Sequence, residues 1–371
     1  MHRNYRAVAI TLLAIAALAI SSQGQSYRPT SLFRFVNMVQ SARITAMGGT
    51  WISHRDADIG QALANPAQLQ LPQSALLSFQ PAFLPASTQG GSIGFAFPLR
   101  PYLHAHLSAQ YINYATMANT DVYGNKIGDI QPSEQAWILG VAYQPSTKWS
   151  AGVNIKWIHS SLQPYSATAL LVDIGATYQL DDRHTTLGIT WRNAGILLKK
   201  YRTADEPLPT ELLIGLTRRL KYLPLRLHLT YRRLTRFQST YNTPIREPSP
   251  LFGPAPTNTT PSLLRQLARH FILGGELALG KSEQFRIRMG YNHRLRDDLA
   301  PPFFSLTGMS FGLSLAHKSY RIDYAYARYH VRGNIHQLGL SYQLPPLKSI
   351  APNLGKFVPP APSTPQSTKH Q

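Results

Sequence analysis

The sequence predicts an all-β protein: a 14-stranded antiparallel transmembrane β-barrel with an N-terminal plug or hatch segment. Three observations predict it: apolar side chains at every second position over much of residues 135–344, an export signal at the N-terminus, and connections that alternate between short and long. A strand directs successive side chains to opposite faces, so a strand between lipid and an enclosed polar interior shows this alternation. Repeated behind an export signal, the pattern is typical of an outer-membrane barrel.

The alternation is clearest in Phe285–Asn292, where Phe, Ile, Met and Tyr form one face and Arg, Arg, Gly and Asn form the other. Trp149–Trp157 and Leu225–Tyr231 alternate in the same way. Turn residues between such stretches delimit the strands. The predicted strands are 75–83, 91–99, 103–115, 135–144, 149–162, 167–180, 185–195, 210–220, 225–236, 270–280, 285–294, 303–316, 320–330 and 335–344.

The connections support this assignment independently, because long and short links alternate. The long links are 116–134, 196–209 and 237–269, and the short ones all fall on the opposite side if the first strand starts in the periplasm. Barrels with both termini in the periplasm have short periplasmic turns and longer external loops. A soluble β-sandwich has no reason to sort its loops in this way.

The N-terminus predicts export. Arg3 and Arg6 precede the apolar run Ala7–Ile20, and the small residues Ser22 and Gly24 suit cleavage after Gly24. The run is too short for a transmembrane helix, which needs roughly 20 apolar residues. The expected organisation is a signal peptide at 1–24, a plug or hatch at 25–74, the barrel at 75–344, and a disordered proline-rich periplasmic tail at 345–371.

Composition excludes several classes of function. The chain has no cysteine, so thiol chemistry and disulfides are impossible, and its formal net charge is +20. Such a charge often indicates nucleic-acid binding, but export removes the chain from the genome and no nucleic-acid-binding signature is present. We therefore expect no nucleic-acid partner, and contacts to outer-membrane lipid and anionic lipopolysaccharide instead.

A set of short motifs resembles one family. The run from Ser41 to Gly49, then Asp56-Ala57-Asp58, then Asn65 to Leu69 resembles the opening of the PorV/PorQ group of outer-membrane proteins, relatives of the FadL-type transporters. Further motifs follow in the order of the PorQ branch, so the resemblance extends from about residue 31 to 344. These motifs are 158–166, 173–178, 192–195, 206–209 and 220–226.

The resemblance implies a 14-stranded barrel with an N-terminal hatch and a role in the type IX secretion system of Bacteroidota. It also implies a surface partner of the PorZ type and contact with other secretion components around cargo maturation and attachment. The chain departs from the family in its proline-rich tail, and in a last strand that ends at Leu344 rather than at a terminal aromatic residue. Residues 237–269 are expected to be specific to this lineage.

No arrangement of side chains predicts catalysis, a cofactor or a metal. His54, Asp56 and Asp58 have no third ligand at a suitable spacing, and Gly48-Gly49 lacks a phosphate-binding pattern, so a tight turn against the barrel wall is the better interpretation. We expect the two aspartates to cap turns or to pair with arginines of the lumen. The candidate hatch residues are Gly48, Gly49, Asp56, Asp58, Asn65 and Pro66.

Charges inside the predicted strands are expected to face the lumen, because a charge facing lipid would be unfavourable by about 2–4 kcal/mol if cationic. Internal ion pairs are the simplest interpretation, and a charge ladder that conducts a substrate is the alternative. The candidate lumen charges are Asp173, Arg226, Arg286, Arg288, Arg321 and Asp323.

Three functions are compatible with these features. The favoured one is a non-enzymatic component of the type IX secretion system, integral to the outer membrane of a Gram-negative bacterium, whose external loops bind secretion partners. The alternative is a FadL-like transporter of hydrophobic solutes, for which the Arg- and Lys-rich polar face is poorly suited. An extracellular soluble β enzyme is disfavoured by the sorting of the loops and by the absence of site residues.

Overall fold

The computed structural model describes most of the chain between residues 31 and 345. The gaps are residues 39, 73, 181, 183, 202–206, 233–266, 281–282, 300–305 and 331–332. The expected signal peptide, most of the long loop 237–269 and nearly all of the expected tail lie outside the described residues.

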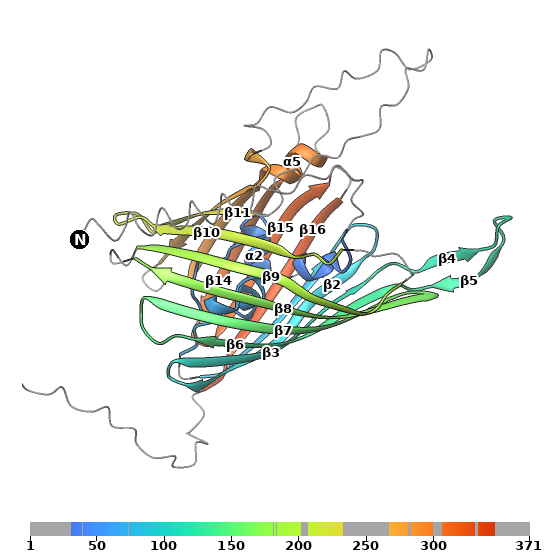
Figure 1. Ribbon diagram of the computed structural model, residues 1–371. Coiled ribbons are helices and arrows are strands. Elements are labelled where there is room, and N and C mark those ends of the chain that lie inside the picture. The colour runs from blue at the N-terminus through green and yellow to red at the C-terminus, as the bar shows by residue number, and fades with distance from the viewer. Residues whose placement is uncertain are drawn as a thin grey trace, which may run out of the picture.

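Fourteen antiparallel strands form a closed barrel, in which β1 pairs with both β2 and β16. Figure 1 shows the strands surrounding the short N-terminal helices. The predicted fold class is therefore confirmed. The barrel strands are β1 (Leu76–Phe83), β2 (Gln89–Arg100), β3 (Leu103–Asn113), β6 (Ser133–Tyr143), β7 (Trp149–Leu162), β8 (Tyr165–Gln179), β9 (Thr185–Lys199), β10 (Glu211–Arg219), β11 (Leu225–Arg232), β12 (Phe271–Leu279), β13 (Phe285–Asn292), β14 (Met309–His317), β15 (Tyr320–His330) and β16 (Gly333–Gln343).

The two faces of the strands differ as the alternation predicts. In β13, Met289 is 51% exposed on the outer face, whereas its neighbour Arg288 is 1% exposed in the lumen. The outer face carries large apolar side chains on every strand from β1 to β16, so hydrocarbon can solvate it, and closure leaves no sheet edge unpaired. This combination is what a membrane requires of a β-structure.

The structure adds a hairpin to one predicted link and moves the start of one predicted strand. The link between β3 and β6 contains a separate hairpin, β4 (Met117–Thr120) with β5 (Lys126–Ile130), which projects beyond the barrel in Figure 1. Between β13 and β14 the chain forms α5 (His293–Leu299), so β14 begins six residues later than predicted, at Met309. Period-two alternation does not separate a free hairpin from a loop, and a short helix inside a loop carries almost no periodic signal.

The segment before β1 lies inside the barrel as four short helical elements. These are η1 (Arg34–Asn37), α2 (Ala42–Ala46), α3 (Ile59–Ala64) and η2 (Pro66–Gln68). We call residues 31–74 the hatch. Helix α2 packs against β13–β16, while η2 packs against β6–β8, so the hatch spans the lumen from one wall to the other. Within the described residues, no helix is both long and apolar enough to cross a membrane.

Candidate functional site: the hatch in the barrel lumen

A glycine turn holds the hatch against the wall. Gly48 and Gly49 both have φ of +87°, a left-handed backbone that favours glycine, and the Gly48 N–H donates to the Ser310 hydroxyl at 3.0 Å. A Cβ atom on Gly48 would lie 2.7 Å from the Ile272 side chain. The structure thus places this predicted pair in a turn directly beside β12 and β13.

Glycines of the barrel wall leave room for the hatch backbone to approach. A Cβ atom on Gly290 would lie 2.1 Å from the backbone nitrogen of Gly48, and one on Gly188 would lie 2.2 Å from the Ile52 carbonyl oxygen. Any larger residue at these positions would displace the hatch backbone. Sequence reasoning missed them, although glycine on the inward-facing parity of a strand is a usable signal of close backbone approach.

Three other predicted hatch residues shape its helices. The Asp58 carboxylate caps α3 by accepting from the Gly60 N–H at 2.8 Å. The Asn65 side chain accepts from the Ala67 N–H at 3.1 Å and donates to the Ile52 carbonyl at 2.8 Å. Pro66 is the first residue of η2, where a missing N–H is tolerated. All three therefore have structural partners within the hatch.

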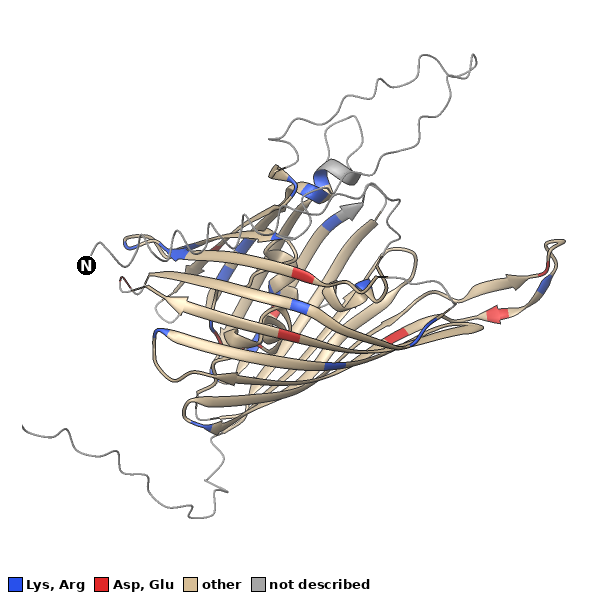
Figure 2. Ribbon diagram, in the orientation of Figure 1, with Lys and Arg blue, Asp and Glu red and all other residues tan. Residues whose placement is uncertain are grey.

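Buried and half-buried charges join the hatch to the wall near the short turns of β11–β15, the end expected to face the periplasm, and we call them the ionic network. Figure 2 marks the Lys, Arg, Asp and Glu positions along the ribbon. Arg43 of α2 lies 2.5 Å from Asp56 and 3.3 Å from Glu276, and Glu276 also contacts Arg288 at 2.7 Å. The network holds five arginines and five carboxylates, and the half-exposed Arg219 also contacts its member Glu283 at 3.1 Å. Its members are Arg43, Arg226, Arg286, Arg288 and Arg321 with Asp56, Asp58, Glu276, Glu283 and Asp323.

Five of the predicted lumen charges belong to this network, and all five lie on strands of the barrel wall. Asp323 accepts from Arg288 at 2.7 Å and from Arg321 at 3.0 Å, and Arg321 also lies 3.2 Å from Asp58 of the hatch. Arg226 bridges Glu276 and Glu283 at 2.7 and 2.6 Å, and Arg286 lies 3.6 Å from Asp56 of the hatch. Prediction missed Arg43, because no alternation marks lumen-facing positions outside the strands.

The electrostatics of the hatch follow from burial beside arginines. Burial alone would raise the pKa of Asp56, but Arg43 above all, with other cations around it, holds that pKa well below its usual range. Burial, reinforced by Arg43, lowers the pKa of His54 to about 3. His54 is therefore neutral at physiological pH, and its ring stacks on Trp51 with centroids 4.7 Å apart.

A second set of buried charges lies on the opposite wall. Asp173 pairs with Lys156 at 2.6 Å and accepts from the Asn193 N–H at 2.8 Å. The prediction grouped Asp173 with the arginines of β11–β15, and the structure separates it from them. Lys156 was missed because it stands alone between apolar neighbours on β7, where a lysine gives no sign of its partner.

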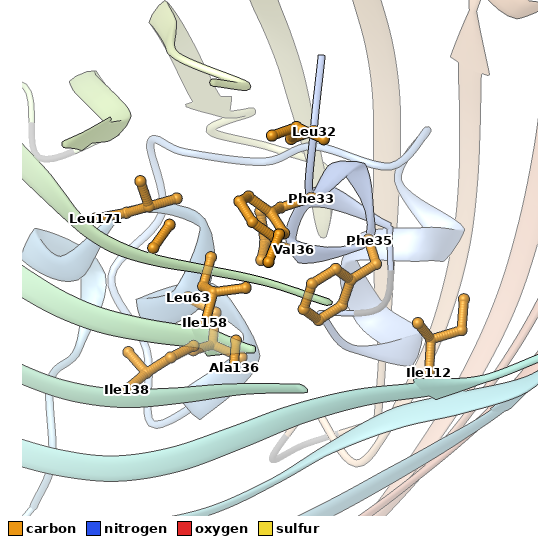
Figure 3. Packing of buried hydrophobic residues seen from close by; sticks show 12 residues of the cluster. Leu32, Phe33, Phe35, Val36, Leu63, Ile112, Ala136, Ile138, Ile158 and Leu171 are labelled. Atoms are coloured by element: carbon orange, nitrogen blue, oxygen red, sulfur yellow. The ribbon is translucent and has the colours of Figure 1, made fainter. Parts of the chain in front are cut away.

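One part of the external end of the lumen is apolar, and Figure 3 shows its packing. Phe35 and Val36 of η1 are 1% and 0% exposed, and they pack with Leu63 of the hatch and Ile112 and Ile158 of the wall. Leu84, Tyr114, Leu197, Tyr201 and Leu208 cover this group from outside. We call these residues the apolar cluster. The buried Glu211 at this end also pairs with Arg192 and Arg232, at 3.2 and 2.8 Å.

Among the described residues, the hatch fills much of the lumen with packed side chains. The two hollows best defined among the described residues both lie at the rims, one beside Arg218 and one beside Tyr114. In the described part of the chain, no group of three His, Cys, Asp or Glu side chains could hold a metal ion. The candidate functional site is therefore the hatch itself, which side-chain contacts hold inside the barrel.

Several solved structures of bacterial transporters are similar to this barrel. The toluene transporter TodX of Pseudomonas putida matches with a TM-score of 0.51 at 14% identity, covering 85% of this chain and 99% of TodX. The toluene transporter TbuX of Ralstonia pickettii gives 0.48 at 14% identity over 84% and 99% of the two chains. A FadL homologue of Pseudomonas aeruginosa gives 0.47 at 13% identity over 81% and 98%.

No family model matches the chain, and no curated protein matches its sequence. The similarity to TodX therefore establishes the fold, which is FadL-like: a 14-stranded barrel with an N-terminal segment inside it. The chain is therefore a closed β-barrel with the fold of the toluene transporter TodX.

Proposed function

We propose that this protein is a PorQ-type component of the type IX secretion system of a Bacteroidota species, and that its external surface binds a partner of the PorZ type during cargo maturation and attachment. The observation that carries the proposal is the packing of the hatch in the lumen. Buried ion pairs of the ionic network hold the hatch at one end, and the apolar cluster fills the other end. A barrel filled in this way suits a membrane anchor better than a conduit.

The projecting hairpin is the best external surface for a partner. At its tip Val122 and Tyr123 are 92% and 87% exposed, and Ile127 on β5 is 64% exposed. The hairpin β4–β5 that carries them lies in one of the long links and projects beyond the barrel in Figure 1. Exposed apolar groups on a free β-hairpin favour protein recognition through side-chain anchors and strand addition.

The experiment is deletion of the protein in its host, with two readouts measured in parallel. The proposal expects loss of surface attachment of secreted cargo and normal uptake of toluene and of long-chain fatty acids. Complementation with V122S/Y123S should restore the barrel in the membrane but not cargo attachment. The matched control K126Q, in the same hairpin, should restore both. Normal attachment with lost uptake would overturn the proposal.

A second candidate function is a channel for hydrophobic compounds, which the TodX-like fold favours because TodX is a toluene transporter. The apolar cluster gives this candidate a site, since withdrawal of η1 would leave an apolar recess lined by residues such as Ile112 and Ile158. Conduction would also require the ionic network to open. Liposomes that contain the protein should then take up toluene faster than empty liposomes, which the first proposal does not expect.

A further inference from the structure

The end of β10 and the periplasmic turn that follows it carry three cations, Arg218, Arg219 and Lys221. A hollow of about 420 Å³ lies at the base of this turn, next to the turn between β8 and β9. Three other periplasmic turns, at 100–102, 144–148 and 317–319, carry a single Arg or Lys each. The residues that line the hollow are Asp182, His184, Arg218, Arg219, Leu220 and Lys221.

Two of these cations have no acidic partner among the described residues. Arg218 has no carboxylate within 4.0 Å, and Lys221 contacts only the Tyr222 ring, 5.4 Å from its centroid. Arg219, in contrast, pairs with Glu283 at 3.1 Å. The Asp182 carboxylate accepts from the Thr185 N–H and hydroxyl at 2.9 and 2.7 Å, so it is already hydrogen-bonded within its own turn. Net positive charge therefore remains in the hollow.

The cations stand where the apolar outer surface ends. Arg218 lies on the outward parity of β10, directly after Leu212, Ile214 and Leu216, so its side chain ends a lipid-facing row. Tyr222 and Leu223 in the turn are 88% and 57% exposed. A cation that continues an apolar row at the edge of a barrel reaches the level of the lipid phosphates.

We propose that this turn is a binding site for an anionic phospholipid of the periplasmic leaflet. Its phosphate lies in the hollow between Arg218 and Lys221, and its acyl chains follow Leu216 and Leu227 on the outer wall. Charge complementarity selects an anionic headgroup, and continuity with the lipid-facing rows selects a lipid over free phosphate. The site is independent of the external surface to which secretion partners are assigned.

Native mass spectrometry of the full mature chain in detergent tests this site. The protein is titrated with phosphatidylglycerol and with phosphatidylcholine of the same acyl chains. The proposal expects preferential retention of phosphatidylglycerol by the unaltered protein. The affinity should fall about fivefold for each cation removed, hence roughly twentyfold in R218Q/K221Q. The matched control R100Q/K318Q removes two cations from two other turns and should change the affinity less than about twofold.

Three results would overturn the proposal: equal retention of the two lipids, an equal loss in the control variant, or inorganic phosphate that displaces phosphatidylglycerol at equimolar concentration. The heat-dependent shift in electrophoretic mobility reports whether each variant has a folded barrel. If R218Q/K221Q fails that check, the single variant K221Q in the exposed turn replaces it, with an expected loss of about fivefold.

Discussion

The two ends of the lumen hold the same hatch by different means. At the periplasmic end, Arg43 of the hatch reaches a wall carboxylate, Glu276, inside a network of arginines and carboxylates. At the external end, Phe35 and Val36 are buried among aliphatic wall residues such as Ile112. Ion pairs require defined distances and directions, whereas apolar contacts tolerate small displacements. The ion pairs at the periplasmic end therefore position α2 closely. The external end adds apolar burial to a few hydrogen bonds, such as the one from the Asn193 side chain to Asn37 at 3.1 Å.

This difference gives the two ends separate roles in any movement of the hatch. Removing one partner of a buried ion pair leaves an uncompensated charge in the lumen, while removing an apolar side chain leaves a cavity. Variants at the two ends should therefore free different parts of the hatch from the wall. The predictions below separate the two contributions, from the largest expected effect to the smallest.

The largest effect is expected at Glu276. E276Q leaves Arg43, Arg226 and Arg288 without their shared carboxylate and should lower the free energy of unfolding by about 3–5 kcal/mol. Urea titration of the protein in detergent, followed by tryptophan fluorescence, measures the change. The control D129N breaks the exposed Lys126–Asp129 pair and should change it by less than about 1 kcal/mol. Equal effects of the two variants would contradict the assigned role of the ionic network.

At the apolar end, F35A should lower the free energy of unfolding by about 3 kcal/mol, because Phe35 is 1% exposed and its loss leaves a cavity. Limited proteolysis should show cleavage near η1 in this variant while Arg43 and α2 stay protected. The outward-facing Phe79, 43% exposed, is the control, and F79A should leave the cleavage pattern unchanged. Cleavage throughout residues 31–74 would show that the apolar end positions the hatch after all.

The free energy of unfolding should also depend on pH through His54 of the hatch. Burial lowers the pKa of His54 to about 3, below its unfolded value near 6.5, so the unfolded chain binds a proton in this window and the folded chain does not. Stability should thus fall as pH drops from 6.5 toward 3, by about 2 kcal/mol between pH 7 and 5. Unfolding titrations of H54Q should lack this contribution, and an unchanged pH profile would contradict the assignment.

The smallest effect is expected at a helix cap. N65A removes the side chain that accepts from the Ala67 N–H and donates to the Ile52 carbonyl, and it should lower the free energy of unfolding by about 1 kcal/mol. Asn119 in the exposed hairpin offers the matched control, since N119A should change stability by less than about 0.5 kcal/mol. A loss as large as that of E276Q would place the cap among the main determinants of hatch position.

The barrel was predictable from sequence because lipid and lumen impose opposite requirements on alternate residues. Ile287 and Met289 against Arg286 and Arg288 carry this signal locally, without reference to any other strand. The same logic placed Asp173 and Asp323 in the lumen. It could not find their partners, because pairing depends on how the wall closes and not on position along one strand.

The interior of the hatch was harder to predict. Its helices have six residues or fewer, too short for a periodic signal, and Arg43 acquires its role only through contact with Glu276, 233 positions away in the sequence. Wall glycines such as Gly290 are meaningful only opposite Gly48. Contacts of this kind arise from the closed barrel and have no local sequence pattern.

The central claim is that the hatch seals the lumen, and ion conductance across a planar lipid bilayer tests it most directly. The refolded mature chain should insert without a steady conductance, whereas E276Q should give transient openings because the periplasmic clamp is broken. A steady open conductance from the unaltered chain, equal to that of E276Q, would contradict the account.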